Sequence, residues 1–347
     1  MRVADFDFDL PPELIAQAPA PERGASRLMV LERETGRLTH LHSRDLPSFV
    51  APGDLVVVND TQVFPARLRG RRLPGGGAVE CLLLRRIDAA TWDALVHPGQ
   101  KLHEGGRVVF ERDGVKLAGE VVARHFHGRR TIRLWREDGG DVDAAIDRLG
   151  EVPLPPYIKR APTLVDRERY QTVYARVRGS VAAPTAGLHL TPETLSTIRA
   201  RGASWATVTL HVGYGTFQPV RSEIVEEHRI DPEPWTIDAA TASAVNDAIA
   251  EGRRIIAVGT TTTRTLEAVA REHGRLVAGS GEADLFIYPG YRFVVVGGLL
   301  TNFHLPRSSL LMLVAAFAGR ERLLAAYREA VERRYRFYSY GDAMLIL

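Results

Sequence analysis

Polar side chains crowd one short connection of this chain, between an apolar run at 286–300 and an apolar helical pattern at 309–319. They are Asn302, His304, Arg307 and Ser308. The apolar run predicts two buried strands joined by a Pro-Gly turn, and ligands of open α/β sheets bind at the carboxyl ends of strands. Helix capping explains Ser308 by itself. An amide, an imidazole and a guanidinium beside it exceed what capping needs, so we predict a binding site here.

Two segments rich in small residues follow a similar pattern. GSVAAPTAGLH (179–189) contains Thr185 and Gly187 and ends at His189; small residues let a ligand approach the backbone closely. LHVGYGTF (210–217) places His211 near a strand end, with Gly213 and Gly215 beyond it. The alternatives are a tight structural loop for the first segment and a core histidine for the second. Neither segment has the glycine spacing of a dinucleotide-binding loop.

A third strand runs into a threonine-rich helix start, AVGTTTTRTLE (257–267). Free backbone N–H groups and the helix dipole favour an anion at such a terminus. Thr260 and Thr261 would then lie beside a phosphate or a carboxylate, with Arg264 as a possible partner. Simple capping by the threonines is the competing interpretation.

Carboxylates supply two further candidates. VVVNDTQVFPARL (56–68) brings Asn59, Asp60 and Arg67 to the end of an apolar strand, although Asx turns explain the first two equally well. YRFYSYGDAMLIL (335–347) contains Tyr340 and Asp342 before an apolar final strand, which seals the sheet whether or not Asp342 takes part in chemistry.

Composition limits the class of protein. With 347 residues, 45% hydrophobic and 25% charged, the chain suits a globular protein of two domains. The single cysteine excludes an internal disulfide and fits a reducing compartment, and no Cys/His spacing suggests a metal. No apolar stretch is long enough to span a bilayer and no secretory signal is visible. We therefore expect a cytoplasmic protein with no membrane partner.

Charge is unevenly distributed. The segment 61–136 holds 15 lysine and arginine residues against 7 aspartates and glutamates, a local net charge of +8, whereas the whole chain carries +3. The same stretch reads as short strands separated by Gly and Asp turns, which predicts a β-barrel or sandwich. We expect 66–150 to be a basic β-barrel domain inserted into a layered α/β domain made of 1–65 and 151–347. A basic module indicates a polyanionic partner, unless its charges are simply solvated.

Taken together, the blocks of this sequence resemble the S-adenosylmethionine:tRNA ribosyltransferase-isomerase family of queuosine biosynthesis. The resemblance is carried by FDFDLPPELIAQ, GDLVVVNDTQVFPARL, GSVAAPTAGLHLT, HVGYGTFQPV, GTTTTRTLE, FIYPGYRF, LLTNFHLPRSSLLMLVAAFAG and YRFYSYGDAM. It implies an α/β domain interrupted by a small β-barrel. It also implies transfer and isomerisation of the ribosyl part of S-adenosylmethionine onto 7-aminomethyl-7-deazaguanine at the wobble position of tRNA. Epoxyqueuosine-tRNA, adenine and methionine would be the products.

Under this resemblance S-adenosylmethionine is a consumed co-substrate, no cofactor is tightly bound, and tRNA is the second substrate of a monomer. A base must take a proton from the ribose C5′ carbon or from the attacking amine, and an acid can assist adenine departure. Histidine suits both tasks near neutral pH, so His189, His211 and His304 are hypothesised to supply them. Asp60 or Asp342 could neutralise the aminomethyl cation or the sulfonium, and the helix start at 260 could hold the methionine carboxylate.

Some positions depart from the family pattern. Asp231 and Pro232 stand where a second histidine and a serine are usual, Leu190 stands where Phe is usual, and Tyr214 replaces a small residue. These departures leave a divergent paralogue with another substrate as one alternative. A non-catalytic RNA-binding protein that uses the basic barrel is another. A methyltransferase is disfavoured, because no glycine-rich loop follows a first strand.

Overall fold

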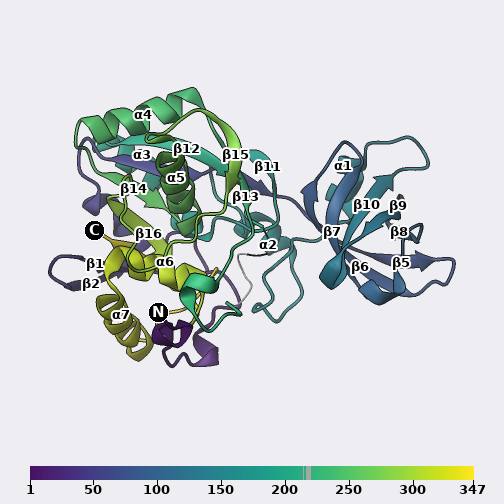
Figure 1. Ribbon diagram of the computed structural model, residues 1–347, viewed down its shortest axis with the longest axis horizontal. Helices are drawn as coiled ribbons and strands as arrows, with labels where there is room; N and C mark the ends of the chain where they lie inside the picture. Colours follow the sequence, from purple (N-terminus) through teal and green to yellow (C-terminus); the bar gives the residue numbers. More distant parts are fainter. Residues whose placement is uncertain (214, 216–219) are drawn as a thin grey trace.

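The computed structural model describes residues 1–213, 215 and 220–347. Figure 1 shows a large α/β body, which contains both termini, and a smaller β-barrel beside it. Tyr214, one of the departures from the family pattern, lies outside the described residues. The layered α/β fold with a small β-barrel, predicted from the sequence, is confirmed.

A mixed sheet of nine strands, counted over the described residues, forms the centre of the large body. In spatial order its strands are β15 (Gly279–Ala283), β13 (Glu233–Ile237), β12 (Ser204–Leu210), β3 (Leu55–Asn59), β14 (Ile255–Val258), β16 (Gly298–Asn302), β17 (Ala343–Ile346), β1 (Arg27–Leu31) and β2 (Leu38–His42). Strands β12, β3, β14 and β16 are parallel. Their carboxyl ends therefore lie at one edge of the sheet.

The sequence of β3, LVVVN, shows why this sheet is covered on both faces. All five residues are buried, and side chains of a strand alternate between the two faces. Leu55 and Val57 belong to one hydrophobic core with α4 (Ala239–Ala250), α5 (Thr260–His273), α6 (Ser309–Ala318) and α7 (Arg320–Glu332). Val56 and Val58 belong to a second core with α3 (Pro192–Ala200). An apolar run without alternation is typical of such a strand.

The helix starts follow the capping residues of the sequence. The Thr191 side chain accepts a hydrogen bond from Thr194 N at 3.1 Å, with Pro192 at the first helical position of α3. Ser308 caps α6 in the same way, accepting from Leu311 N at 3.2 Å. The capping interpretation of Ser308 is therefore confirmed. Helix α2 (Leu164–Arg169) lies in the segment that returns from the barrel.

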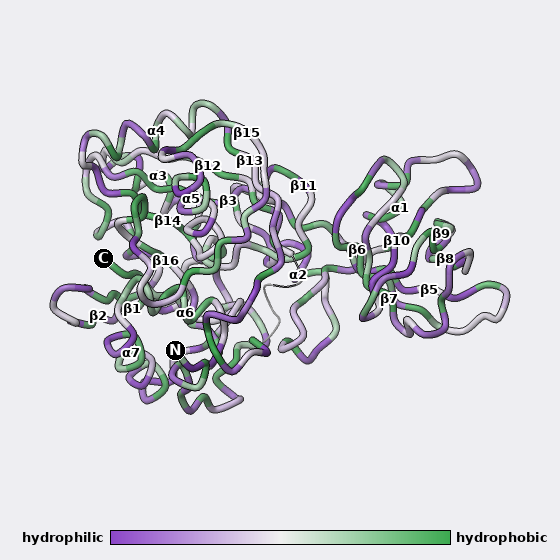
Figure 2. Tube along the Cα trace, in the orientation of Figure 1, coloured by the Kyte–Doolittle hydropathy of each residue, from purple (hydrophilic) through white to green (hydrophobic). Residues whose placement is uncertain are grey.

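Six strands form the closed barrel: β5 (Arg67–Leu73), β6 (Ala78–Arg86), β7 (Thr91–His97), β8 (Arg107–Arg112), β9 (Val115–Arg124) and β10 (Arg129–Trp135). Helix α1 (Val142–Leu149) contributes Ala145, Ile146 and Leu149 to the barrel core. Buried and exposed positions alternate along β10, and Figure 2 shows hydrophilic and hydrophobic residues mixed around the barrel. Closure leaves no unpaired sheet edge, which stabilises a small β-domain.

The strand prediction for 286–297 is wrong. Over the described residues the chain forms no strand between β15 and β16. The side chain of Glu267, on α5, accepts hydrogen bonds from the backbone N–H groups of Val294, Val295 and Val296 at 2.9–3.0 Å. It also accepts one from the Tyr291 hydroxyl at 3.1 Å. A buried carboxylate thus replaces the neighbouring strand as the partner of this apolar backbone.

Candidate active site

A pocket opens where β14 and β16 end side by side. The empty space between its lining atoms, including the part open to solvent, is about 470 Å³. Its lining residues are Ala183, Pro184, Thr185, Ala186, Val212, Gly259, Thr260, Thr261, Thr301, Asn302, His304, Leu310, Tyr338 and Ser339. Three segments singled out in the sequence, around 185, 260 and 302, therefore meet at one place. Predicted residues Thr185, Thr260, Thr261, Asn302 and His304 all lie in this pocket.

The start of α5 faces this pocket without a capping side chain. Gly259 precedes the helix with a φ of 96°, and among the described residues no side chain accepts from the first N–H groups. The hydroxyls of Thr262, Thr263 and Thr265 bond instead to carbonyl oxygens four residues earlier, at 2.7–3.1 Å. Local capping by these threonines is therefore excluded, and the helix presents its dipole and free N–H groups to the pocket. An anion is the ligand that such a terminus favours.

His304 lies in the pocket wall with 4% of its surface exposed. Its backbone N–H donates to the Tyr327 hydroxyl at 3.0 Å, and its Nε2 lies 3.4 Å from Thr301 Oγ1. Among the described residues, its Nδ1 has no hydrogen-bond partner. Burial lowers the pKa of His304 to about 3, because the charged ring would lose its hydration. The imidazole is neutral at physiological pH, with one nitrogen available to a ligand.

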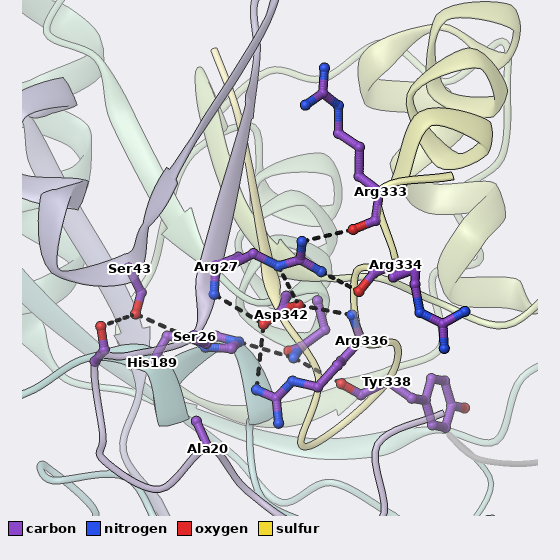
Figure 3. A network of polar contacts seen from close by, with 12 residues as sticks. Ala20, Ser26, Arg27, Ser43, His189, Arg333, Arg334, Arg336, Tyr338 and Asp342 are labelled. Carbon is purple, nitrogen blue, oxygen red and sulfur yellow. Dashed lines mark hydrogen bonds and ion pairs between the residues drawn. The ribbon is translucent and has the colours of Figure 1, made fainter. Parts of the chain in front are cut away.

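His189 and Asn302 form a buried pair at the back of the pocket. Asn302 Nδ2 lies 3.1 Å from His189 Nε2 and 3.1 Å from the Tyr338 carbonyl oxygen. His189 Nδ1 lies 2.7 Å from Ser26 Oγ, and Figure 3 shows this contact continuing to Ser43. Burial lowers the pKa of His189 to about 4, against a smaller opposing effect of Asp342. Both ring nitrogens of His189 are therefore engaged.

A second polar group surrounds His211, next to the pocket residue Val212. His211 Nδ1 lies 2.8 Å from Thr61 Oγ1, and burial lowers the pKa of His211 while Asp60 opposes this effect. Asp60 is buried, accepts from Thr209 Oγ1 at 2.6 Å and pairs with Arg176 at 2.8 Å. His211 and Asp60 do not line the pocket itself, but they occupy the adjoining ends of β12 and β3.

The side chain of Asn59 connects two strands of the sheet. Its Oδ1 accepts from Leu210 N at 3.0 Å and from Thr61 N at 3.1 Å, and its Nδ2 donates to the Leu210 carbonyl oxygen at 2.8 Å. The amide thus joins the ends of β3 and β12 and also makes the turn that the sequence offered as the alternative. These three hydrogen bonds explain why the Asn59 side chain is buried, without any contact to a ligand.

Asp342 lies outside the pocket and holds the C-terminal segment in place. Its carboxylate accepts from Arg27 N at 3.0 Å and Arg336 N at 2.8 Å, and both guanidinium groups lie within 3.4 Å of it. Arg27 also donates to the carbonyl oxygens of Arg333 and Arg334 (Figure 3). All these contacts connect β1, β17 and the end of α7, so they explain the buried carboxylate structurally.

Arg264 points away from the pocket. It is buried in α5 and forms an ion pair with Glu233 of β13, and burial lowers its pKa to about 10. Glu233 also accepts from the backbone N–H of Gly213 at 2.8 Å. The side chain of Asp231, one of the departures from the family pattern, faces Gly215. Because Arg264 is paired with Glu233, a ligand in the pocket meets the backbone of α5 rather than this arginine.

The remaining predicted residues are dispersed. Tyr340 donates to Asp166 at 2.8 Å, and Arg307 pairs with Asp7 at the surface. Arg67 lies at the root of the barrel, 3.5 Å from Glu80. Gly187 packs so closely on the Tyr174 hydroxyl that a side chain there would collide with it, which keeps the 185–189 turn compact. None of these four lines the pocket.

Sequence reasoning missed several lining residues, chiefly Tyr338, Ser339, Ala183 and Leu310. The aromatic run at 335–340 is visible in the sequence before the final strand, but of its members only Tyr340 is predicted as a site residue. Tyr338 has a φ of 73°, an uncommon conformation for a residue with a side chain. That turn directs the Tyr338 carbonyl oxygen to Asn302, and a sequence carries no signal for it.

The two buried histidines predict a loss of stability in mild acid. Their folded-state pKa values, about 4 for His189 and about 3 for His304, lie below the unfolded value of about 6.5. The unfolded chain thus binds more protons below that pH, and stability falls as the pH decreases. Lowering the pH from 6 to 5 should cost about 1 kcal/mol for each histidine. Urea denaturation at both pH values measures this, and an unchanged difference in His304→Gln would contradict it.

Fold and pocket define a class: an α/β protein with an accessory β-barrel and a neutral, buried polar pocket at the strand ends. The model of the queuosine biosynthesis protein family matches residues 3–346. This chain belongs to that family. A protein of Moorella thermoacetica named S-adenosylmethionine:tRNA ribosyltransferase-isomerase is 52% identical over 347 residues, and the match covers all of both chains. A protein of Solibacter usitatus with the same name is 53% identical, also with full coverage of both.

The resemblance extends to a solved structure over the whole chain. The crystal structure of S-adenosylmethionine tRNA ribosyltransferase from Thermotoga maritima is 40% identical and matches with a TM-score of 0.57. The match covers 99% of this chain and 100% of that one. Within the described residues, no group of three or more His, Cys, Asp or Glu side chains could hold a metal ion. No helix of this described part has the length and apolar character to cross a membrane.

Proposed function

We propose that this protein is an S-adenosylmethionine:tRNA ribosyltransferase-isomerase. It transfers the ribosyl moiety of S-adenosylmethionine to 7-aminomethyl-7-deazaguanine at the wobble position of tRNA, giving epoxyqueuosine-tRNA, adenine and methionine. The observation that carries the proposal is full-length identity of 52–53% to proteins of that name. The pocket supports it, because it offers an anion site and neutral hydrogen-bonding groups in one buried place. S-adenosylmethionine is a consumed co-substrate in this proposal, and a tRNA substrate implies the cytoplasm.

Within the pocket, the start of α5 is the proposed site of the methionine carboxylate, with Thr260 and Thr261 beside it. His304 is the proposed proton acceptor, because a neutral imidazole with an unpartnered Nδ1 can take a proton from the ribose C5′ carbon or the attacking amine. His211 and Asp60 form the proposed second centre, near the entering tRNA base. There the Asp60 carboxylate would neutralise the aminomethyl cation.

The test of the function uses purified protein, S-adenosylmethionine and tRNA that carries 7-aminomethyl-7-deazaguanine. Adenine release and the modified nucleoside are followed by mass spectrometry, and tRNA with unmodified guanine serves as the control. We expect adenine and the ribosyl-derived epoxide only with the modified tRNA. Binding of tRNA without adenine release would indicate an RNA-binding role instead. Release of adenine with another RNA would indicate a paralogue with another substrate.

We further propose that residues 66–150 form an inserted domain that contacts the tRNA backbone. The two passages of the chain between the bodies meet at the bridge between Arg67 and Glu151, as an insertion requires. Most barrel arginines are already in ion pairs, for example Arg129 with Asp93 at 2.9 Å. Arg130 is only 2% exposed and donates to the carbonyl oxygens of Gly99 and Leu102. Its charge therefore holds loops together and is unsuitable for a binding test.

Lys101 and Arg124 are the better test of this surface. Both are exposed, and neither has an ion pair within the part of the chain that the structure describes. Reversing both to Glu should weaken tRNA binding at least about fivefold near 0.1 M salt and lower the salt slope by about 1–2. The matched control reverses Arg322 and Arg328 on α7, which lies on the far side of the large body from the barrel (Figure 1). Equal losses in both double variants would contradict a specific barrel contact.

A further inference from the structure

A line of hydrogen bonds connects the pocket with the loop before β1, and it ends on a carbonyl oxygen at each side. At the pocket end, Asn302 Nδ2 lies 3.1 Å from the Tyr338 carbonyl oxygen and 3.1 Å from His189 Nε2. His189 Nδ1 then contacts Ser26 Oγ at 2.7 Å, and Ser26 Oγ contacts Ser43 Oγ at 3.0 Å. At the far end, Ser43 Oγ donates to the Gly24 carbonyl oxygen at 2.8 Å. Figure 3 shows the part from Ser43 to His189.

The hydrogen bond to the Gly24 carbonyl oxygen determines which atom is the donor in each of the following contacts. A carbonyl oxygen only accepts, and a serine hydroxyl has a single proton to donate. The Ser43 proton goes to Gly24, so Ser43 Oγ must accept from Ser26. Ser26 has then used its proton, so it must accept from His189 Nδ1. Nδ1 therefore carries the ring proton.

The pocket end leads to the same tautomer independently. The amide of Asn302 must turn its NH₂ group to the Tyr338 carbonyl oxygen, because the opposite orientation would place two acceptors face to face. The second N–H then donates to His189 Nε2, which must be unprotonated. Both ends thus specify a neutral ring with the proton on Nδ1. His189 has no nitrogen left to exchange a proton with a substrate.

This network determines what the pocket offers to a ligand. With both N–H groups of Asn302 engaged, its Oδ1 is the remaining polar atom. It is buried in a residue only 3% exposed and has no hydrogen-bond partner among the described residues. Asn302 lines the pocket beside the uncapped start of α5, because Val258, the last residue of β14, pairs with Leu300, two residues before the end of the parallel strand β16. An acceptor and an anion site therefore lie at the carboxyl ends of two neighbouring strands, which are themselves spaced about 4.8 Å apart.

We propose that His189 is a positioning residue that orients the Asn302 amide, and that Asn302 Oδ1 accepts a hydrogen bond from the α-ammonium group of the substrate's amino-acid moiety. The inference rests on the proposed function, which supplies an amino-acid group as part of S-adenosylmethionine. The carboxylate of that group meets the N–H groups of α5, and the ammonium meets the neighbouring amide oxygen. Since no carboxylate lines the described pocket, a neutral acceptor satisfies the ammonium there.

The ligand assignment is tested by calorimetry with two probes, S-adenosylmethionine and 5′-methylthioadenosine, which lacks the amino-acid group. Asn302→Ala should weaken binding of S-adenosylmethionine at least about tenfold and that of methylthioadenosine less than about twofold. Equal losses for both probes would overturn the ammonium contact in favour of the adenine or ribose. Unchanged affinity for S-adenosylmethionine would also overturn it. If neither probe binds the native protein, the proposed function and this contact both fail.

The positioning role is tested separately, with variants of His189 and without turnover. His189→Gln keeps an acceptor that can face Asn302, whereas His189→Ala removes it. We expect His189→Ala to lose affinity for S-adenosylmethionine as Asn302→Ala does, and His189→Gln to recover most of it with an unchanged pH profile. ¹⁵N NMR of the ligand-free protein should show His189 protonated on Nδ1 alone at neutral pH. Protonation on Nε2, or equal defects in both variants, would overturn the positioning role whether or not the protein transfers ribose.

Discussion

Replacing His304 by alanine should reduce the rate of adenine release at least about 100-fold, because a positioned general base contributes this much or more. Affinity for S-adenosylmethionine should change only a few-fold in the same variant. The reason is geometric: His304 Nδ1 is unpartnered among the described residues, in a ring that lines the pocket. Burial keeps the ring neutral, so a nitrogen is free of a proton before the reaction, but the lowered pKa also reduces its basicity. Single-turnover kinetics with the modified tRNA measures the rate, and calorimetry the affinity.

The control for this variant is His273→Ala, at the partly exposed end of α5. It removes an imidazole from the same protein without touching the pocket, and its rate should equal that of the native protein. His304→Ala also removes a ring that is 4% exposed, so circular dichroism must first show that the variant is folded. A folded His304→Ala variant with the native rate would remove His304 from the mechanism. The proton acceptor would then have to be sought at His211.

The sequence predicted those parts of the structure that depend on local patterns. Ser308 marks the start of α6, because a capping side chain acts on the residues next to it. The buried strands β3 and β14 follow from uninterrupted apolar runs. The pocket was also foreseeable in outline, since the polar segments around 185, 260 and 302 all follow or adjoin strands. Parallel strands bring such segments to one edge of the sheet.

Pairings between distant polar residues were not predictable in this way. Asp342 and Arg264 suggested chemistry by type, but the first joins Arg27 to Arg336 and the second pairs with Glu233. Sequence shows that a charged residue is present and does not show its partner, which lies far along the chain. For the same reason Asn302 was identified as a site residue, whereas the part of His189 in orienting it was not. Burial makes such a pairing necessary, because a buried charge must have a partner wherever in the sequence that partner lies.

Glu267 gives the clearest case of such a distant pairing, and Glu267→Ala should lower the free energy of unfolding by about 3–5 kcal/mol. Its side chain is completely buried and accepts four hydrogen bonds, three of them from consecutive backbone N–H groups at 294–296. Truncation leaves these donors without an acceptor in the core. Urea denaturation measures the loss, with Glu272→Ala on the exposed side of α5 as a control that should change by less than about 0.5 kcal/mol.

The same substitution should also act on the pocket, because the segment that Glu267 holds leads directly into β16 and Asn302. A displaced 294–296 segment would shift the end of β16, so affinity for S-adenosylmethionine should fall together with stability. Glu267→Gln separates the loss of the carboxylate from the loss of side-chain volume. It retains one carbonyl oxygen but turns an NH₂ group toward backbone donors, so it should be destabilised nearly as much while keeping the volume of the side chain. Wild-type stability in Glu267→Gln would show that the carboxylate is not the partner that keeps this apolar segment out of the sheet.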